Sequence, residues 1–383
     1  MRAWSALAGL LFLFSGTVYA SDWPMFMHDL NHTGYSGDQI NATAFALSWS
    51  YPTGGWVSSS PAVVGGVVFI GSNDNRLYAL NAGTGLQVWN YTAGDSVDAS
   101  PAVVGGVVYA SSENNITFAL NASTGEALWN YTVGDDMGPP TAANGFVYVG
   151  SWYNSKLYAL NATTGTHVWN YSALVRVTSP PAVVNGVLFI GNTGPTVYAL
   201  NASDGGHMWN YSIGNSVYSS PTVSEGRVFF SSHDFRVHAL NASTGEHIWN
   251  YTTGESISST PAVAYGMVYV GSRDNKTYAL NASTGEHIWN YTTGDWMESS
   301  PAIAGGMVFT GSNDDIVYVL NASTGGLLWS YTTSGSVGTS PAIADGIIYI
   351  AGGSTVYAFI PSDSQTLTVP LTLGWNLISI PLG

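Results

Sequence analysis

The chain has 383 residues, no cysteine, and 23 acidic against 8 basic residues, which gives a formal net charge of −15. This balance argues against nucleic-acid binding, because such binding needs a basic surface that releases counterions from phosphate. The lack of cysteine excludes disulfides and a lipid-modified cysteine, so packing and ring closure must stabilise an exported fold.

Residues 1–20 have the pattern of a secretory signal peptide. Arg2 precedes an apolar run, and the small residue Ala20 offers a cleavage site before Ser21. The apolar run is short for a membrane span, and no later stretch is apolar enough to cross a bilayer. The sequence therefore predicts secretion, with an extracellular or cell-surface location.

A tryptophan recurs every 40 residues along most of the chain. A period near 40 with one aromatic per copy is typical of a β-propeller, in which a single repeat cannot bury its faces alone. Each indole ring can bury about 150–250 Å², so we expect these residues to dock one blade against the next. The eight copies are Trp49, Trp89, Trp129, Trp169, Trp209, Trp249, Trp289 and Trp329.

Each repeat predicts four antiparallel strands, because short β-branched and aromatic runs alternate with turns of Gly, Asn and Asp. A lone strand at 46–51 precedes the first full repeat, and no matching fourth strand follows Phe359. We expect this N-terminal strand to complete the last blade, which closes the ring and removes an open edge. The predicted fold is all-β, an eight-bladed β-propeller of four-stranded antiparallel blades over residues 46–360.

Residues 361–383 leave the repeat. Leu367–Pro370 and Gly374–Pro381 have the composition of strands and resemble the opening of β-modules in archaeal surface proteins. Two interpretations stay open: this C-terminal β tail is a truncated further module, or its strands pack onto the propeller.

Asn-x-Ser/Thr motifs form two rows, one directly after the tryptophans and one in the turn between the third and fourth strands. Glycans would supply the solubility that a charged fraction of 8% does not. The alternative is that duplication copied asparagines that cap hairpins. The glycosylation candidates are Asn90, Asn121, Asn130, Asn161, Asn170, Asn201, Asn210, Asn241, Asn250, Asn281, Asn290 and Asn321.

The segment Ala119–Trp129 resembles the tryptophan-docking repeat of PQQ-type (quinoprotein-type) propellers, and the pattern recurs through Trp329. At the position where that family usually has Asp, this chain has Asn, and the substitution creates the Asn-x-Ser/Thr motifs. Asp22–Phe26 with His32–Gly34 resembles the strap that opens many secreted proteins of this kind, so we expect a strap over residues 21–45. The resemblance implies two branches: dehydrogenases that carry pyrroloquinoline quinone (PQQ) with calcium, and non-enzymatic platforms such as the lipoprotein of the bacterial outer-membrane assembly machinery.

Copies differ most in the loops that lead into the first strand of each blade. These loops, with the turns between second and third strands, form what we call the funnel face, where only Asn115 and Asn275 lie in glycosylation motifs. Exposed tryptophans there can stack on a ligand or anchor a protein, although neutral drift of exposed loops is an equal explanation. The predicted ligand- or partner-binding residues are Trp56, Asp98, Asp136, Arg176, Tyr218, Trp296 and Glu298.

No acid–base pair, activated nucleophile or metal site is recognisable, so we expect no catalytic residue and no resident cofactor. A row of histidines, each two residues before a tryptophan, lies on successive outer strands, too far apart to share one metal ion. These are His167, His207, His247 and His287. Asp-containing turns at Asp74, Asp234, Asp274 and Asp314 are better explained as hairpins than as calcium loops.

We expect a non-catalytic binding or scaffold protein at the cell surface, with a surface or secreted protein, or a small ligand, at the funnel face. One alternative is a PQQ-dependent quinoprotein oxidoreductase. It is disfavoured because the funnel is acidic and would repel a tricarboxylate, and because the vicinal cysteines and long insertions of that branch are missing. A carbohydrate-binding surface protein is a third possibility, which rests on the exposed aromatic residues.

Overall fold

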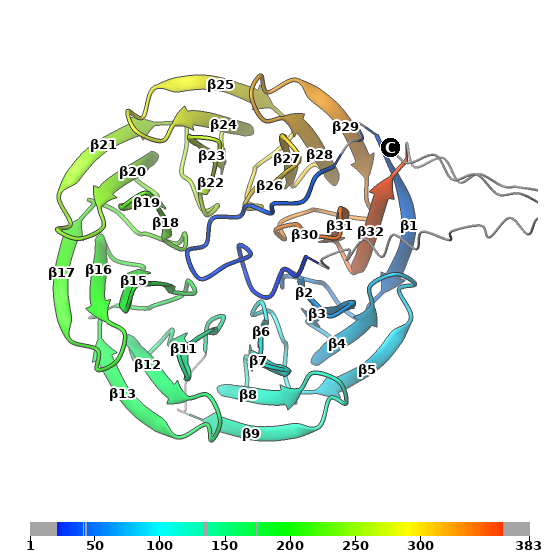
Figure 1. Cartoon of the computed structure of the whole chain (residues 1–383), viewed down its shortest axis with the longest axis vertical. Coiled ribbons are helices and arrows are strands. Elements are labelled where there is room, and N and C mark those ends of the chain that lie inside the picture. Colours follow the sequence, from blue (N-terminus) through cyan, green and yellow to red (C-terminus); the bar gives the residue numbers. More distant parts are fainter. Residues whose placement is uncertain (1–20, 41, 43, 133–136, 174, 363–383) are drawn as a thin grey trace, which may run out of the picture.

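The computed structural model describes residues 21–40, 42, 44–132, 137–173 and 175–362, and these form 32 strands in eight four-stranded sheets. The sheets surround a central axis like blades (Figure 1). No helix long and apolar enough to cross a membrane occurs in the described part of the chain. The eight-bladed propeller predicted from the 40-residue period is confirmed.

The first four blades follow one another in chain order. The first contains β2 (Ala62–Val64), β3 (Val67–Ser72), β4 (Arg76–Asn81) and β5 (Gln87–Thr92). The second contains β6 (Ala102–Val104), β7 (Val107–Ser112), β8 (Ile116–Asn121) and β9 (Ala127–Thr132). The third contains β10 (Thr141–Ala143), β11 (Phe146–Gly150), β12 (Lys156–Asn161) and β13 (His167–Ser172). The fourth contains β14 (Ala182–Val184), β15 (Val187–Gly191), β16 (Thr196–Asn201) and β17 (His207–Ser212).

The remaining blades repeat this pattern until the ring closes. The fifth contains β18 (Thr222–Ser224), β19 (Arg227–Ser231), β20 (Arg236–Asn241) and β21 (His247–Thr252). The sixth contains β22 (Ala262–Ala264), β23 (Met267–Ser272), β24 (Lys276–Asn281) and β25 (His287–Thr292). The seventh contains β26 (Ala302–Ala304), β27 (Met307–Gly311), β28 (Ile316–Asn321) and β29 (Leu327–Thr332). The eighth contains β30 (Ala342–Ala344), β31 (Ile347–Gly352), β32 (Thr355–Pro361) and β1 (Phe45–Pro52).

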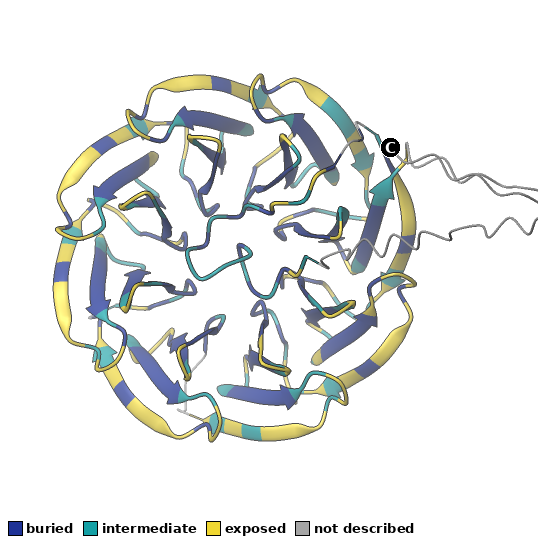
Figure 2. Ribbon diagram, in the orientation of Figure 1, coloured by how far each residue is buried: buried dark blue, intermediate teal, exposed yellow. Residues whose placement is uncertain are grey.

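The N-terminal strand closes the ring as expected. Strand β1 pairs antiparallel with β32, from Phe45 opposite Pro361 to Pro52 opposite Thr355. The eighth blade is thereby complete, and the paired segments extend one residue beyond the predicted limits at each end. The inner three strands of each blade are mostly buried, whereas the outer strand is mostly exposed (Figure 2).

The repeat tryptophans lie at the joints between blades. The indole Nε1 of Trp249 donates a hydrogen bond of 3.1 Å to the carbonyl oxygen of Ala282 in the next blade. The same bond recurs from five other tryptophans: Trp49, Trp89, Trp129, Trp209 and Trp289. The two exceptions are Trp169, whose buried Nε1 has no partner among the described residues, and half-buried Trp329, whose ring lies against Phe45 and Phe359.

A glycine of the following blade lies directly on each of seven indole rings. Gly285 has φ +73°, and a Cβ placed on it would lie 2.6 Å from Cε3 of Trp249. The corresponding pairs begin with Gly85 on Trp49 and end with Gly325 on Trp289. Glycine is required at these positions for two reasons: the backbone is in the left-handed region, and the indole ring occupies the space that a side chain would need.

The N-terminal strap runs across the face opposite the funnel face, over the turns between first and second strands (Figure 1). It forms backbone hydrogen bonds with the first strands of six blades, at Val63, Val103, Val183, Val223, Val263 and Ile303. Phe26 projects from the strap into the central channel. The channel is therefore a blind funnel, closed at the strap and open at the funnel face. The predicted signal peptide (1–20) and the tail from residue 363 lie outside the described residues.

Candidate ligand-binding face

The funnel face holds most of the exposed aromatic surface. Among the described residues, seven large aromatic side chains are exposed, and Tyr265 alone among them lies on the strap side. The other six lie in loops and turns of the funnel face: Trp56, Trp152, Tyr153, Tyr218, Phe235 and Trp296. Exposed aromatic rings gathered on one face are typical of binding surfaces, because they supply large contact areas with little conformational entropy to lose.

A cavity of about 220 Å³ lies at the centre of this face. Its mouth is lined by Asp98, Tyr218 and Glu298, and Phe26 of the strap forms part of its wall. Its charged lining residues are these two carboxylates, of which Glu298 is paired with Arg273, so the lining offers carboxylates to a cation and no basic side chain to an anion.

A ring of hydroxyl groups surrounds the cavity. Five backbone N–H groups each donate to a serine or threonine hydroxyl of the next blade at 2.9–3.0 Å, and the bond from Ser340 to Ser60 joins the eighth blade to the first. The accepting residues are Ser60, Ser100, Thr260, Ser300 and Ser340, and all five line the cavity. Pro139 and Pro180 occupy the corresponding places in the third and fourth blades and interrupt the ring. Within the described residues these five hydroxyls donate no hydrogen bond, so their protons are available to a ligand or water.

A second cavity of about 270 Å³ lies beside the third blade, where the repeat is irregular. It is lined by Asp98, Glu113, Met137, Trp152 and Thr178, together with Ser58, Ala99, Gly138 and Pro139. The two cavities share Asp98, so they form one connected surface on the funnel face.

Arg273 organises the opposite side of the funnel face. Its guanidinium bonds Glu298 Oε1 at 2.6 Å and lies over the ring of Trp296, 5.0 Å from its centroid. Asn313 Nδ2 donates to the other carboxylate oxygen of Glu298 at 3.3 Å. Because an aromatic face and a carboxylate both stabilise a cation, the arrangement fixes Trp296 and Glu298 in place.

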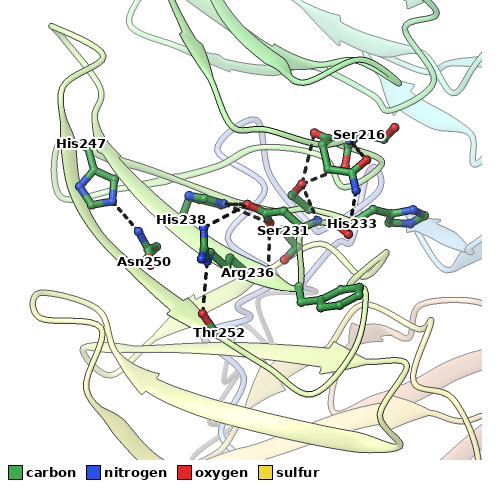
Figure 3. Close-up of polar contacts among 12 residues, drawn as sticks. Ser216, Ser231, His233, Arg236, His238, His247, Asn250 and Thr252 are labelled. Carbon is green, nitrogen blue, oxygen red and sulfur yellow. Dashed lines mark hydrogen bonds and ion pairs between the residues drawn. The ribbon is translucent and has the colours of Figure 1, made fainter.

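Tyr218 and His233 form a neighbouring pair, with ring centroids 4.5 Å apart. His233 Nε2 is 3.1 Å from Ser258 Oγ (Figure 3 shows the turn that carries His233). Burial lowers the pKa of His233, and the positive charge of Arg273 lowers it further, against a smaller opposing effect of Glu298. The imidazole therefore stays neutral at pH 7 and is suited to hydrogen bonding with an uncharged group.

The structure places six of the seven predicted site residues on the funnel face. Asp98, Tyr218 and Glu298 meet at the central cavity, and Trp56 and Trp296 are half exposed on the loops that lead into the first and seventh blades. Arg176 lies apart from them, over the ring of Tyr153 at 5.2 Å from its centroid. Asp136 falls outside the described residues.

Several residues of the funnel face were not among the binding residues predicted from the sequence. They are Glu113, Tyr153, His233, Arg273 and Asn313, which all lie in the turns between second and third strands. These positions are also spaced by 40 residues and also vary from copy to copy. That variation is the sequence signal that could have identified them.

The candidate metal motifs have structural partners. Asp274 Oδ2 accepts hydrogen bonds from Gly254 N and the Tyr278 hydroxyl, and Asp74 and Asp314 make the equivalent pairs. Asp234 instead bonds His238 at 3.0 Å (Figure 3). In the part of the chain that the structure describes, no group of three or more His, Asp or Glu is placed to hold a metal ion.

The fold, the tryptophan docking and the blind funnel define a PQQ-type eight-bladed propeller. A family model described as "Outer membrane protein assembly factor BamB" matches residues 39–136, 90–171, 153–260 and 233–368. The chain belongs to this family. No curated protein sequence matches it significantly.

Solved structures with the same fold include BamB and several dehydrogenases. BamB from Moraxella catarrhalis has a TM-score of 0.74 at 19% identity, with 82% of this chain and 99% of that chain covered. A europium-containing methanol dehydrogenase has a TM-score of 0.79 at 14% identity, with 89% and 98% covered. Quinohemoprotein alcohol dehydrogenase from Comamonas testosteroni has a TM-score of 0.77 at 15% identity, with 95% and 83% covered. At these identities the similarity shows the fold and does not select an activity.

Proposed function

We propose that the protein is a non-catalytic binding platform outside the cell, which captures a partner or ligand at the funnel face. The gathering of six exposed aromatic side chains on this one face is the observation that carries the proposal. The strap occupies the opposite face and closes the channel there, so a ligand of the channel enters from the funnel face. The family name and the leader-like segment at 1–20 support a role at the cell envelope or surface.

Replacing Trp56 and Trp296 by alanine together is expected to weaken binding about tenfold or more, because exposed aromatic anchors dominate interface energies. The melting temperature should change little, since both side chains are half exposed. Binding of the labelled full-length protein to intact cells or envelopes of its source measures the effect. Leu86→Ala is the matched control, because Leu86 is 70% exposed in a turn on the strap side. Unchanged binding by the double variant would contradict the site assignment.

The alternative quinoprotein function requires PQQ with calcium in the central funnel. The residues lining the described cavity do not fit a tricarboxylate: they include Asp98 and Glu298 and no Lys, Arg or His. We therefore expect no micromolar binding in a calorimetric titration with PQQ, whether or not calcium is present. Binding in that range would instead favour the oxidoreductase alternative.

A carbohydrate ligand is the second candidate, and the hydroxyl ring favours it. Sugar hydroxyls both donate and accept hydrogen bonds, which matches free serine and threonine protons below two carboxylates and a rim of aromatic rings. Competition of cell binding by soluble oligosaccharides separates this candidate from a protein partner.

A further inference from the structure

The outer strands form an apolar rim that lacks the usual protection of exposed strand edges. Each is the last strand of its sheet, and none of the six from β5 to β25 contains Asp, Glu, Lys or Arg. Each of these six has one exposed aliphatic side chain immediately before its tryptophan. The rim residues, 41–51% exposed, are Val88, Leu128, Val168, Met208, Ile248 and Ile288. Exposed apolar edges without charges favour edge-to-edge pairing between molecules.

An asparagine of an Asn-x-Ser/Thr motif immediately follows each of these six tryptophans. The tryptophan points inward, so the aliphatic residue before it and the asparagine after it both face solvent. These six asparagines, which we call the outer row, are Asn90, Asn130, Asn170, Asn210, Asn250 and Asn290, and all are exposed. A group attached to an outer-row asparagine would extend over the neighbouring rim residue.

The two outer strands without the motif also lack the rim residue. In β1 the tryptophan is flanked by Ser48 and Ser50, and in β29 it is flanked by half-buried Leu328 and Ser330. Their exposed leucines, Leu47 and Leu327, lie one residue earlier, before the bulge in each strand. The motif thus occurs where an exposed aliphatic residue directly precedes the tryptophan.

The second row of motifs, in the turns between third and fourth strands, has a different explanation. Asn121 Oδ1 accepts the backbone N–H groups of Ser123 and Thr124 at 2.9 and 3.1 Å. Asn81 makes the same turn, with 3.1 and 2.9 Å to Gly83 and Thr84, although its tripeptide Asn-Ala-Gly is no glycosylation motif. An asparagine is therefore needed at this position for the turn itself. This turn row comprises Asn121, Asn161, Asn201, Asn241, Asn281 and Asn321.

We propose that the outer row is N-glycosylated and that the sugars cover the apolar rim, whereas the turn row is structural. In the modification, Nδ2 loses a proton and bonds to the anomeric carbon of a lipid-phosphate-linked oligosaccharide from the host. The bond from that carbon to phosphate breaks, and the phosphate leaves with its electron pair.

The local geometry accommodates this bond. Asn250 Nδ2 lies 3.1 Å from His247 Nε2 (Figure 3), and Asn170, Asn210 and Asn290 make the same contact with the histidine three residues earlier. A glycosylated amide keeps one hydrogen, which still donates to the histidine. Three of these histidines also stack on a tyrosine of the preceding blade, as His247 does on Tyr211 at 6.2 Å. The histidine row thus anchors the asparagine side chains to the outer surface.

Glycopeptide mass spectrometry of the full chain, secreted from an N-glycosylating host, tests the assignment. We expect occupancy in the outer row to exceed that in the turn row several-fold. Equal or higher occupancy of the turn row would overturn the proposal, as would an unmodified outer row.

A second measurement tests whether the sugars of the outer row cover the apolar rim. Replacing the Ser or Thr of all six outer-row motifs by alanine removes the motifs but keeps the asparagine–histidine contacts. We expect this variant to self-associate in sedimentation experiments at an about tenfold lower concentration than the glycosylated protein. Adding threonine substitutions at the six rim residues should restore the monomer. A glycan-free variant that remains as monomeric as the wild type would contradict the role of the sugars.

Discussion

Replacing Gly285 by alanine is expected to lower the free energy of unfolding by about 2–4 kcal/mol, the sum of a left-handed backbone penalty and overpacking. The new Cβ would lie 2.6 Å from Cε3 and 2.7 Å from Cδ2 of Trp249, and the indole cannot withdraw without breaking its 3.1 Å bond to Ala282. Chemical denaturation of the two proteins under the same conditions measures the difference. The expected loss is therefore largely a loss of blade docking.

Gly266→Ala provides the matched control. Gly266 has φ +71°, and nothing lies within 4 Å of the position that its Cβ would take. The control should lose only the backbone penalty, about 1 kcal/mol. Equal losses in the two variants would show that contact with Trp249 contributes nothing and would contradict the docking interpretation.

We expect acid to lower the free energy of unfolding because of His32, a buried residue of the strap. Its Nδ1 is 3.1 Å from the carbonyl oxygen of Pro221, and burial lowers its pKa from 6.5 to about 4, against smaller opposing effects of Asp29 and of that hydrogen bond. Between these two pH values the unfolded chain takes up the proton and the folded protein does not. The free energy of unfolding should therefore be unaffected above pH 6.5 and fall by about 3 kcal/mol as the pH drops through 4.

The variant His32→Asn isolates this effect. Asparagine retains a donor for the Pro221 carbonyl but does not titrate, so its stability should depend less steeply on pH within that window. Denaturation curves recorded from pH 7 to pH 4 compare the two proteins. An unchanged pH dependence in His32→Asn would rule out His32 as the source of acid sensitivity.

The sequence was sufficient to predict the ring because its tryptophans recur at a fixed interval of 40 residues. Strand order within a blade follows from hairpin turns, and the lone strand at 46–51 together with the missing strand after Phe359 leaves one way to close the circle. These are local patterns, repeated eight times. The funnel face was also predictable in outline, because variable positions such as Trp56 and Trp296 stand out against constant ones.

The contacts within that face were not predictable. Arg273 lies in a turn of the sixth blade, whereas its partners Trp296 and Glu298 lie in the loop that leads into the seventh. Their contact depends on the angle between two blades, which a one-dimensional repeat does not encode. The strap was expected, but its path was not, because it has no repeated counterpart. The burial of His32 and the insertion of Phe26 into the channel therefore required the structure.

The pairing of β1 with β32 sets an order on folding. Phe45 is among the first residues of the propeller to be synthesised and its partner Pro361 is the last, so β1 has no partner strand until more than 300 further residues have been synthesised. Loop closure over such a distance is slow compared with hairpin formation. The first seven blades can assemble from neighbouring segments as they emerge, but the eighth cannot. A chain interrupted at any point before β32 would therefore leave the edge of β1 unpaired and open to pairing with the strands of other molecules.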